Sequence, residues 1–390
     1  MENPKIRFKG FTKDWEQRKL GEVFKEYSEK NHTELPALTI IQGGGTVKRE
    51  DSDRNLMYDE SNLSNYKMVR KDDFIVHLRS FEGGLEKSAL DGIVSPAYHT
   101  FHSDVADSRF YYPYFRSHEF IKHKLVPHVY GIRDGRSIDI DGMKIIEIPY
   151  TSTEEQRQIG DYLESLDHLI TLHQRKCEQT KKLKKYMLQK MFPQNGAKVP
   201  EIRFDGFTYD WEQRKLGELG AVQTCKRIFK EQTSEQGDIP FFKNGTIGLE
   251  PDSYISREVY EEFRRLYPYP EVGDTLISVV GSIGRTAEYT GKDEYFQDSN
   301  VVWLKTDGSI NKKFLKISYQ VIKWLIEGST VKHLYNDNIL RSEIVMPPSQ
   351  IEQAKIATTF EALDHLITLH QRQCDELKKM KKYMLQNMFI

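Results

Sequence analysis

The chain has 390 residues, of which 38% are hydrophobic and 29% are charged, and its formal net charge is −1. This length exceeds what a single hydrophobic core usually fills, so two or more domains are expected. A charge near zero argues against a simple histone-like role, because any nucleic-acid binding must then come from local basic patches.

Hydropathy and cysteine content indicate the environment of the chain. No apolar run is long enough to cross a membrane, and the first residues, MENPKIRFKG, lack the pattern of a signal peptide. The three cysteines are too few for a disulfide framework. We therefore expect a reducing, cytoplasmic location.

Two segments of the chain occur twice. DWEQRKLGE is found at Asp14–Glu22 and again at Asp210–Glu218, and LDHLITLHQR at Leu166–Arg175 and again at Leu363–Arg372. Between these anchors the halves hardly resemble each other, and only two pairs of segments echo one another: 71–80 with 272–282, and 145–149 with 343–347. The sequence predicts two tandem copies of one fold that carry different surfaces.

A long helix is predicted over residues 153–192, after a first domain that spans residues 1–152. A capping box from Thr153 to Gln156 indicates its start. Apolar or seam-compatible residues then recur in alternating steps of four and three, the period of a coiled coil. They are Ile159, Leu163, Leu166, Ile170, His173, Cys177, Thr180, Met187 and Met191. About 38 helical residues would make a rod roughly 57 Å long.

The same order of parts is predicted for the second half. The segment PQNGAKVP ends the first helix with Pro and Gly, which gives a linker at 193–199, a second domain at 200–349 and a second long helix at 350–390. The seam of that helix repeats the first. Its residues are Ile356, Phe360, Leu363, Ile367, His370, Cys374, Leu377, Met384 and Met388.

Charge gives the expected direction of packing, because both helices begin acidic and end basic. In an antiparallel pair, the acidic half of each helix would meet the basic half of the other. The same gradients could instead complement only each helix's own dipole. We expect an α+β fold in which two α/β recognition domains are related by a pseudo-twofold axis. Two long antiparallel helices would join them as a coiled coil centred on His173 and His370.

This order of parts resembles, over the whole chain, the specificity subunit of type I restriction–modification systems. Shared local motifs support the resemblance. They are Trp15…Leu20-Gly21 and Trp211…Leu216-Gly217 at the start of each half, and Pro149…Glu155-Gln156 and Pro347…Glu352-Gln353 at the start of each helix. The first copy of the second motif is one residue longer between its proline and its glutamate.

The resemblance implies a non-catalytic DNA-binding subunit of a restriction endonuclease and adenine methyltransferase complex. Each recognition domain would read one half of a bipartite double-stranded target, and the helix pair would set the gap. Two methyltransferase subunits would dock on this chain, and two restriction–translocase subunits would join them. No cofactor is then expected here, because S-adenosylmethionine, ATP and Mg would belong to the partner subunits.

Candidate DNA-binding residues follow from chemistry, since phosphates attract Lys, Arg and loop N–H groups while Arg, Lys, Asn and Gln read base edges. In the first domain they lie in glycine-containing loops: Gln42, Lys48, Arg49, Arg79, Tyr130, Arg133 and Arg136, with Phe81 beside them. In the second domain they are Lys226, Arg227, Lys243, Asn244, Ser282, Arg285, Asn336, Asn338 and Arg341. Any of them could instead be a solvated turn residue.

Other interpretations remain open at this stage. The pairs His173/Cys177 and His370/Cys374 could form a zinc site, or they could only fix the register of the seam. The QGGG segment lacks both the dinucleotide and the P-loop spacings, and MPPS lacks the residue that would open an amino-methyltransferase motif. The alternative functions are a self-contained DNA methyltransferase with a duplicated domain and a coiled-coil scaffold without DNA specificity.

Overall fold

The computed structural model describes residues 3–52, 60–131, 136–280, 283–297, 300–328 and 332–389. The chain divides into two compact units. The first unit comprises Met1–Arg175 together with Gln371–Ile390, and the second comprises Lys176–His370. Each long helix is therefore shared between the units. One division falls directly after the first copy of the repeated decapeptide, and the other falls within the second copy.

The first unit contains an antiparallel four-stranded sheet in the order β2-β9-β6-β7. Its strands and helices begin with β1 (Glu16–Lys19), α1 (Leu20–Val23), β2 (Lys25–Tyr27), β3 (Leu38–Ile41), β4 (Gly45–Lys48), β5 (Lys67–Val69), β6 (Phe74–Val76), α2 (Ser80–Gly83) and β7 (Glu86–Lys87). They continue with β8 (Gly92–Val94), β9 (His99–His102), α3 (Ser108–Phe115), β10 (Val129–Tyr130), β11 (Ser137–Ile138), α4 (Ile140–Lys144) and β12 (Glu147–Tyr150). Aromatic residues of α3 pack with Phe24 and Phe74 to form the core beside this sheet.

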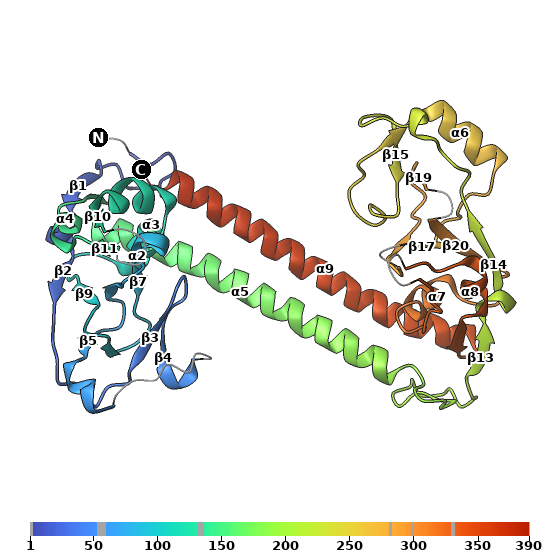
Figure 1. Cartoon of the computed structure of the whole chain (residues 1–390), viewed down its shortest axis with the longest axis horizontal. Helices are drawn as coiled ribbons and strands as arrows, with labels where there is room; N and C mark the ends of the chain where they lie inside the picture. The colour runs from blue at the N-terminus through green and yellow to red at the C-terminus, as the bar shows by residue number, and fades with distance from the viewer. Residues whose placement is uncertain are drawn as a thin grey trace. The chain divides into compact units, whose positions relative to one another are not determined.

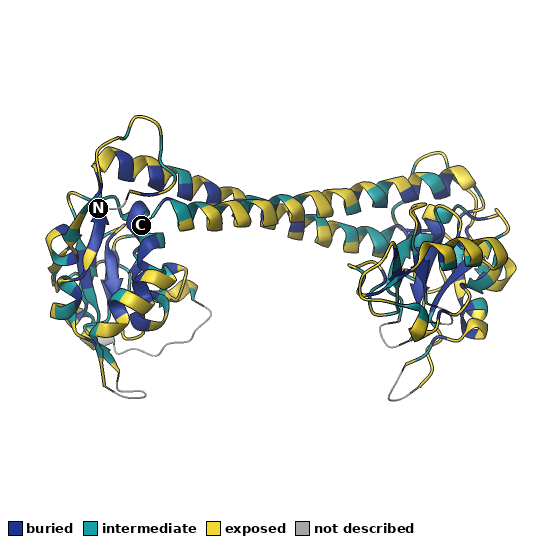
Figure 2. Cartoon of the chain, turned by 90° about the horizontal axis from the view of Figure 1, so that it is seen from above, coloured by how far each residue is buried: buried dark blue, intermediate teal, exposed yellow. Residues whose placement is uncertain are grey.

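The second unit has a sheet of the same kind, in the order β14-β20-β17-β18. Its elements are β13 (Glu212–Lys215), β14 (Gly220–Thr224), β15 (Ile239–Phe242), β16 (Tyr254–Ile255), α6 (Arg257–Leu266), β17 (Thr275–Ser278), β18 (Thr286–Glu288), β19 (Tyr295–Phe296), β20 (Val301–Thr306), α7 (Lys312–Ser318), α8 (Asn336–Arg341) and β21 (Glu343–Met346). Within each unit, Figure 1 shows these strands clustered together, and Figure 2 shows buried residues gathered in the interior. The central strands β6 and β17 are buried along their whole length.

The faint sequence echoes mark equivalent strands. The echo of 71–80 with 272–282 contains β6 and β17, each of which lies between the equivalent strands of its own sheet. In the other echo, β12 pairs with β1 just as β21 pairs with β13. The prediction of one duplicated fold is therefore confirmed at the level of strand order.

The units differ in the elements added to this common sheet. The first has the β3–β4 hairpin and the β5–β8 pair, whereas the second has the three-stranded sheet β16-β15-β19 and the helix α6. The halves diverge in sequence where these additions lie, so the fold is shared while the surfaces are not.

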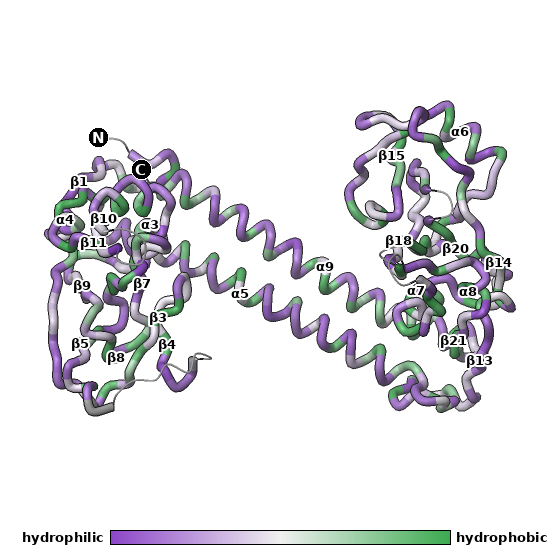
Figure 3. Tube along the Cα trace, viewed as in Figure 1, coloured by the Kyte–Doolittle hydropathy of each residue, from purple (hydrophilic) through white to green (hydrophobic). Residues whose placement is uncertain are grey.

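The two long helices, α5 (Thr153–Lys190) and α9 (Gln350–Asn387), pack antiparallel. In the first unit Lys381 Nζ lies 2.5 Å from Asp167 Oδ1. In the second unit Lys184 Nζ lies 2.6 Å from Asp364 Oδ1. As residue numbers rise along α5, those of its partners fall along α9, and basic ends meet acidic segments as the charge pattern predicts. In Figure 3, apolar and polar residues alternate along both helices.

Ten of the eighteen seam residues proposed from the sequence lie along the middle of the two helices, and they differ in burial. Seven are buried: Leu163, Leu166, Ile170, Cys177, Phe360, Leu363 and Cys374. His173, Ile367 and His370 are intermediate. The thiol of Cys177 lies 3.8 Å from the carbonyl oxygen of Ile367, which places that part of α5 against α9. Among the described residues, no helix is long and apolar enough to cross a membrane.

The end of each long helix completes the core of the unit that the other half of the chain begins. Phe389 packs against Trp15 and Phe110, as Phe192 packs against Trp211 and Phe314. Backbone hydrogen bonds repeat this arrangement: Ile6 N–H donates to the Asn387 carbonyl at 2.9 Å, and Ile202 N–H donates to the Lys190 carbonyl at 2.9 Å. The chain termini in the first unit thus occupy the place that the linker occupies in the second.

The predicted capping box at the start of α5 is wrong by one residue. The hydroxyl that accepts a first-turn N–H belongs to Ser152, which receives the bond from Glu155 N–H at 3.3 Å. Ser349 accepts from Glu352 N–H in the same way at 3.5 Å. The glutamate of each motif is then the third helical residue, and in both units it is buried, as Glu155 and Glu352.

A titratable pair at the edge of the first sheet gives a pH prediction. Asp73 accepts from the Tyr27 hydroxyl and lies 2.5 Å from His102 Nδ1. This hydrogen bond raises the pKa of His102 above its ordinary value of 6.5. A raised pKa in the folded state means that protonated His102 stabilises the fold fully below about pH 6.5. This contribution is lost as the pH rises through the folded-state value.

We expect the unfolding temperature of the first unit to fall above pH 6.5, and to fall less in His102→Gln. Thermal unfolding measured at a series of pH values checks this. His123→Gln, which changes a more exposed histidine of the same unit, serves as the control. Equal pH profiles for wild type and His102→Gln would contradict the assignment.

Candidate nucleic-acid interface

Three segments that are distant in sequence come together in the first unit. They are the turn at 42–44, the loop at 77–84 and the segment that leads into β11. A Cβ added to Gly83 would lie 2.5 Å from Gln42 Nε2, so the first two segments are in direct contact. The Arg136 guanidinium lies 4.4 Å from the centre of the Phe81 ring and 3.7 Å from the Glu82 carboxylate, which brings the third segment onto the second.

The turn at 42–44 has a backbone that requires glycine. Gly43 and Gly45 have φ values of 82° and 75°, in the region that residues with a Cβ rarely adopt. A Cβ at Gly43 would also lie 2.7 Å from Nη2 of Arg116, and one at Gly45 would lie 2.8 Å from the Lys87 carbonyl. The glycine run therefore allows close packing of the turn against β7 and α3.

The second unit also brings together three segments that are distant in sequence. Its loop after β15 contacts the β17–β18 loop, because Arg285 Nη1 donates to the Gly245 carbonyl at 2.8 Å and Asn244 Nδ2 donates to the Val280 carbonyl at 2.5 Å. The segment before α8 joins them where Leu334 N–H donates to the Val279 carbonyl at 2.9 Å. We name these two assemblies the first and second loop clusters.

The structure separates some first-unit candidates and gathers others. Gln42, Arg79, Tyr130 and Arg136 are exposed, and they lie on the segments of the first loop cluster. Lys48 and Arg49 are at the other end of β4, where Lys48 lies 3.7 Å from Glu50 and Arg49 lies over the Tyr66 ring. Arg133 is outside the described residues. The sequence had grouped Lys48 and Arg49 with the glycine turn, and the length of β4 keeps them apart.

The second-unit candidates also fall into distinct environments. Lys243, Asn244 and Arg285 belong to the second loop cluster, where Lys243 Nζ lies 3.0 Å from Asp252. Lys226 and Arg227 are exposed after β14, with Lys226 over the Tyr267 ring. Ser282 is outside the described residues.

The three α8 candidates differ in how much they are used within the protein. The Asn338 amide is buried and donates to Leu325 O at 2.9 Å and to Glu327 Oε1 at 2.7 Å. Arg341 pairs with Asp337 on the same helix, while Asn336 is exposed at its first turn. Of the three, the amide of Asn338 is engaged inside the protein.

Sequence reasoning missed two residues of the first loop cluster. Arg116 is 31% exposed, and its Nη1 donates to Gly43 O at 3.2 Å. Glu86 is fully buried beneath the glycine turn. Neither residue lies in a glycine-rich or basic motif, so only the fold associates them with the cluster. Burial lowers the pKa of His77, at the base of the second segment, which favours its neutral form and leaves arginines as the cations of the cluster.

Each recognition unit is anchored to the start of its long helix by the Glu-Gln motif. Gln156 Oε1 accepts from Asp107 N–H at 3.0 Å, and Gln353 Oε1 accepts from Asn311 N–H at 2.8 Å. Asp107 and Asn311 are the N-cap residues of α3 and α7. The motif thus joins equivalent helices in the two units.

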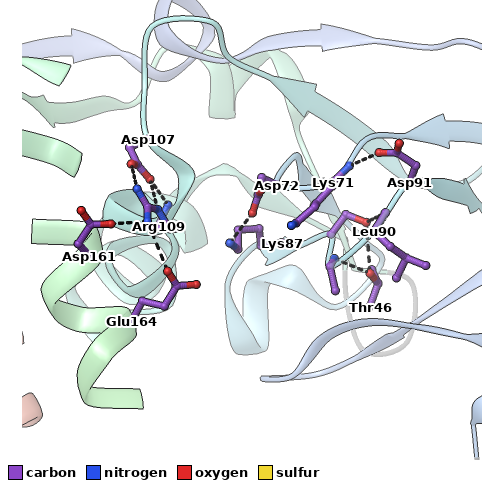
Figure 4. A network of polar contacts seen from close by, with 12 residues as sticks. Thr46, Lys71, Asp72, Lys87, Leu90, Asp91, Asp107, Arg109, Asp161 and Glu164 are labelled. Carbon is purple, nitrogen blue, oxygen red and sulfur yellow. Dashed lines mark hydrogen bonds and ion pairs between the residues drawn. The ribbon is translucent and has the colours of Figure 1, made fainter. Parts of the chain in front are cut away.

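A charged link reinforces this anchor. Figure 4 shows Arg109 of α3 bonded to Asp107 and reaching Asp161 and Glu164 on α5. In the second unit Lys313 Nζ lies 2.9 Å from Glu361 on α9. The junction between loop-bearing domain and helix is therefore built twice from similar contacts.

The described residues add no support for a zinc site at the His173/Cys177 and His370/Cys374 pairs. In the part of the chain that the structure describes, no group of three or more His, Cys, Asp or Glu residues could hold a metal ion. Packing of Cys177 against the α9 backbone accounts for the position of this thiol.

The chain thus contains two copies of one α+β fold, each joined to one of two antiparallel helices, and the two copies carry unlike loop clusters. This arrangement defines a class of recognition proteins with two domains. The family described as type I restriction modification DNA specificity domain matches the chain twice, over residues 12–182 and 209–379. The chain belongs to this family.

Curated relatives and a solved structure agree with this membership. The chain is 46% identical over 159 residues to a putative type I restriction enzyme specificity subunit of Haemophilus influenzae, which covers 40% of this chain and 41% of that protein. It is 24% identical over 268 residues to the type I restriction enzyme MjaVIII specificity subunit of Methanocaldococcus jannaschii, covering 61% of this chain and 60% of that one. The matches thus span less than two thirds of these relatives.

The fold is similar to that of a solved S subunit of a type I restriction–modification system from M. genitalium. The TM-score is 0.64 at 15% sequence identity, and the match covers 100% of this chain and 99% of that chain. At this identity the comparison supports the fold, with its duplicated domains and paired helices.

Proposed function

We propose that this chain is the DNA-reading subunit of a type I restriction–modification complex and is itself non-catalytic. Each loop cluster would contact one half of a bipartite double-stranded target. The observation that carries the proposal is the pair of unlike loop clusters, one on each copy of a duplicated fold of the specificity family. Because the two copies of the fold carry different loop clusters, they would recognise two different half-sites.

The parts of the chain would divide this work. We assign target recognition to residues 1–152 and 200–349, spacing to the helices at 153–192 and 350–390, and connection to the linker at 193–199. Exposed apolar residues recur at equivalent places on both helices, as Leu169 with Leu366 and Tyr186 with Tyr383. This duplication supports docking of two copies of one partner, the methyltransferase subunit.

The remaining assignments follow from such a complex. Two restriction–translocase subunits would complete it, and S-adenosylmethionine, ATP and Mg would be bound by the partner subunits. The net charge of −1 supports shared phosphate contacts, because this chain supplies no overall positive field. The complex would work in the cytoplasm, where its DNA substrate lies.

Exchange of one recognition domain tests the proposal. Replacing residues 24–150 with those of another family member is expected to change one half of the methylation motif and leave the other half unchanged. Methylome sequencing of a host that carries the chain and its partner subunits measures both halves. Wild-type chain without any methylation motif, or an exchange that alters both halves, would refute independent reading.

Lengthening a helix tests the spacer role separately. Four residues inserted after Thr180 add roughly 6 Å of helix, close to two base pairs of DNA. We expect a longer gap between unchanged half-sites. The insertion point precedes Met191 and Phe192, so the core of the second unit is preserved. Half-sites that change while the gap stays constant would rule out the spacer assignment.

A further inference from the structure

A buried carboxylate holds the glycine turn of the first loop cluster from below. Glu86 on β7 has 0% exposure. It accepts from Gly43 N–H at 2.6 Å, from Gly45 N–H at 3.1 Å and from the Tyr112 hydroxyl at 2.8 Å. Three donors on one carboxylate satisfy its charge away from water, and they fix the path of the turn.

A guanidinium holds the same turn from its other side. Arg116 Nη1 donates to the Gly43 carbonyl at 3.2 Å and to the Tyr112 hydroxyl at 3.2 Å, and Arg116 Nε lies 4.0 Å from Glu86. The N–H groups of the turn are thus bound by a carboxylate, and a carbonyl of the turn is bound by a cation. We call Glu86 and Arg116 the turn clamp.

The shared fold does not require this carboxylate. Glu86 pairs with Ile75 in β6, and the corresponding pair in the second unit is Ala287 with Leu276 in β17. A buried charge is costly unless it is well paired, so its presence in one unit alone points to a role specific to that unit. The difference lies at the loop cluster, where the two units would need different chemistry.

The turn clamp positions Gln42, the residue that precedes Gly43. Gln42 is exposed, and its amide lies on the bare backbone of Gly83. Its backbone is therefore fixed on one side and its side chain is supported on another. An exposed amide offers one donor and one acceptor, the pattern that matches N7 and N6 of adenine in the major groove. In the second cluster the Asn244 amide instead donates to Val280 O at 2.5 Å.

We propose that Gln42 reads an adenine in the half-site of the first recognition domain and that Glu86 and Arg116 are positioning residues for that contact. This inference rests on the proposed function. It assigns one base of the half-site to Gln42 and assigns to Glu86 and Arg116 the role of holding Gln42 in position. Loss of the clamp would free the turn, so the amide would spend less time in the reading position.

The test uses the full chain in complex with its methyltransferase partner and a random-sequence duplex DNA library, with selected duplexes read by sequencing. Gln42→Ala is expected to reduce the preference for adenine at one position of one half-site by roughly 5- to 150-fold. Glu86→Gln should reduce preference at the same position, because its amide NH2 faces turn N–H donors. The double variant should lose no more than Gln42→Ala alone.

Glu288→Gln in β18 is the matched control, since it changes a carboxylate on the equivalent strand of the second unit. It should leave the adenine position unaltered. Thermal unfolding measures whether Glu86→Gln is folded. If Glu86→Gln does not fold, Arg116→Lys replaces it as the clamp variant, with the same expected loss of preference at the adenine position. Unchanged selection in the clamp variants, or uniform weakening of the whole half-site, overturns the inference. Absence of any sequence selection by the wild-type complex would overturn the proposed function instead.

Discussion

Replacing Glu155 with alanine is expected to destabilise the first unit by about 3 to 5 kcal/mol. The Glu155 carboxylate is 0% exposed and lies 2.5 Å from Arg7 Nε, and it accepts from Trp15 Nε1 at 3.2 Å. It also raises the pKa of Arg7 through their hydrogen bond. Its removal leaves a largely buried cation and a buried indole N–H without their acceptor, which costs more than the pair itself contributes.

Chemical denaturation of the full chain, followed by hydrogen exchange in the first unit, measures this loss. Glu154→Ala is the matched control, because Glu154 lies one residue away with its side chain 64% exposed and paired with Arg157 on the helix surface. Its effect should stay below about 1 kcal/mol. Similar losses for both variants would argue against the role of buried pairing.

Replacing Phe192 with alanine is expected to destabilise the second unit by about 3 to 5 kcal/mol and to spare the first. Phe192 is 3% exposed, and its ring centre lies 5.8 Å from those of Trp211 and Phe314 and 6.2 Å from that of Phe360. Truncation would leave a cavity among rings from three segments that are distant in sequence. The first unit uses Phe389 at the equivalent place and should be unaffected.

Hydrogen exchange resolved by peptide distinguishes the two units in this experiment. Protection should decrease in β13, α7 and β21 of the second unit and stay unchanged in β1, α3 and β12 of the first. Tyr186→Ala, near the end of α5, provides the control. The Tyr186 side chain is 48% exposed, so its truncation should leave little or no cavity. Equal loss of protection in both units would mean that they unfold together.

The architecture could be predicted because the sequence contains the same anchor segments twice. The repeated anchors identified equivalent helices, and the alternating steps of four and three along them predicted their pairing. The predicted position of the N-cap was wrong because Thr151, Ser152 and Thr153 are consecutive hydroxyl residues, and each of them can accept a hydrogen bond from a first-turn N–H. The second copy, with Ser349 three residues before Glu352, contains the signal that distinguishes them.

The loop clusters could be predicted only in part. Glycines and exposed basic residues marked Gln42, Arg79 and Arg285, because such residues have a local signature. Glu86 and Arg116 have none, since their importance comes from strands and helices that meet the turn only after folding. Single acidic or basic letters within β7 and at the end of α3 look like ordinary surface charges until their burial and partners are known.

The discontinuity of the first unit has a consequence for biosynthesis. Its core lacks Met388 and Phe389 until the end of the second long helix has been translated, whereas the second unit is a single contiguous stretch from Lys176 to His370. The N-terminal portion therefore cannot complete its core before the second long helix has been made. A premature stop shortly before Met384 would leave the downstream unit whole and strip the upstream unit of its closing aromatic.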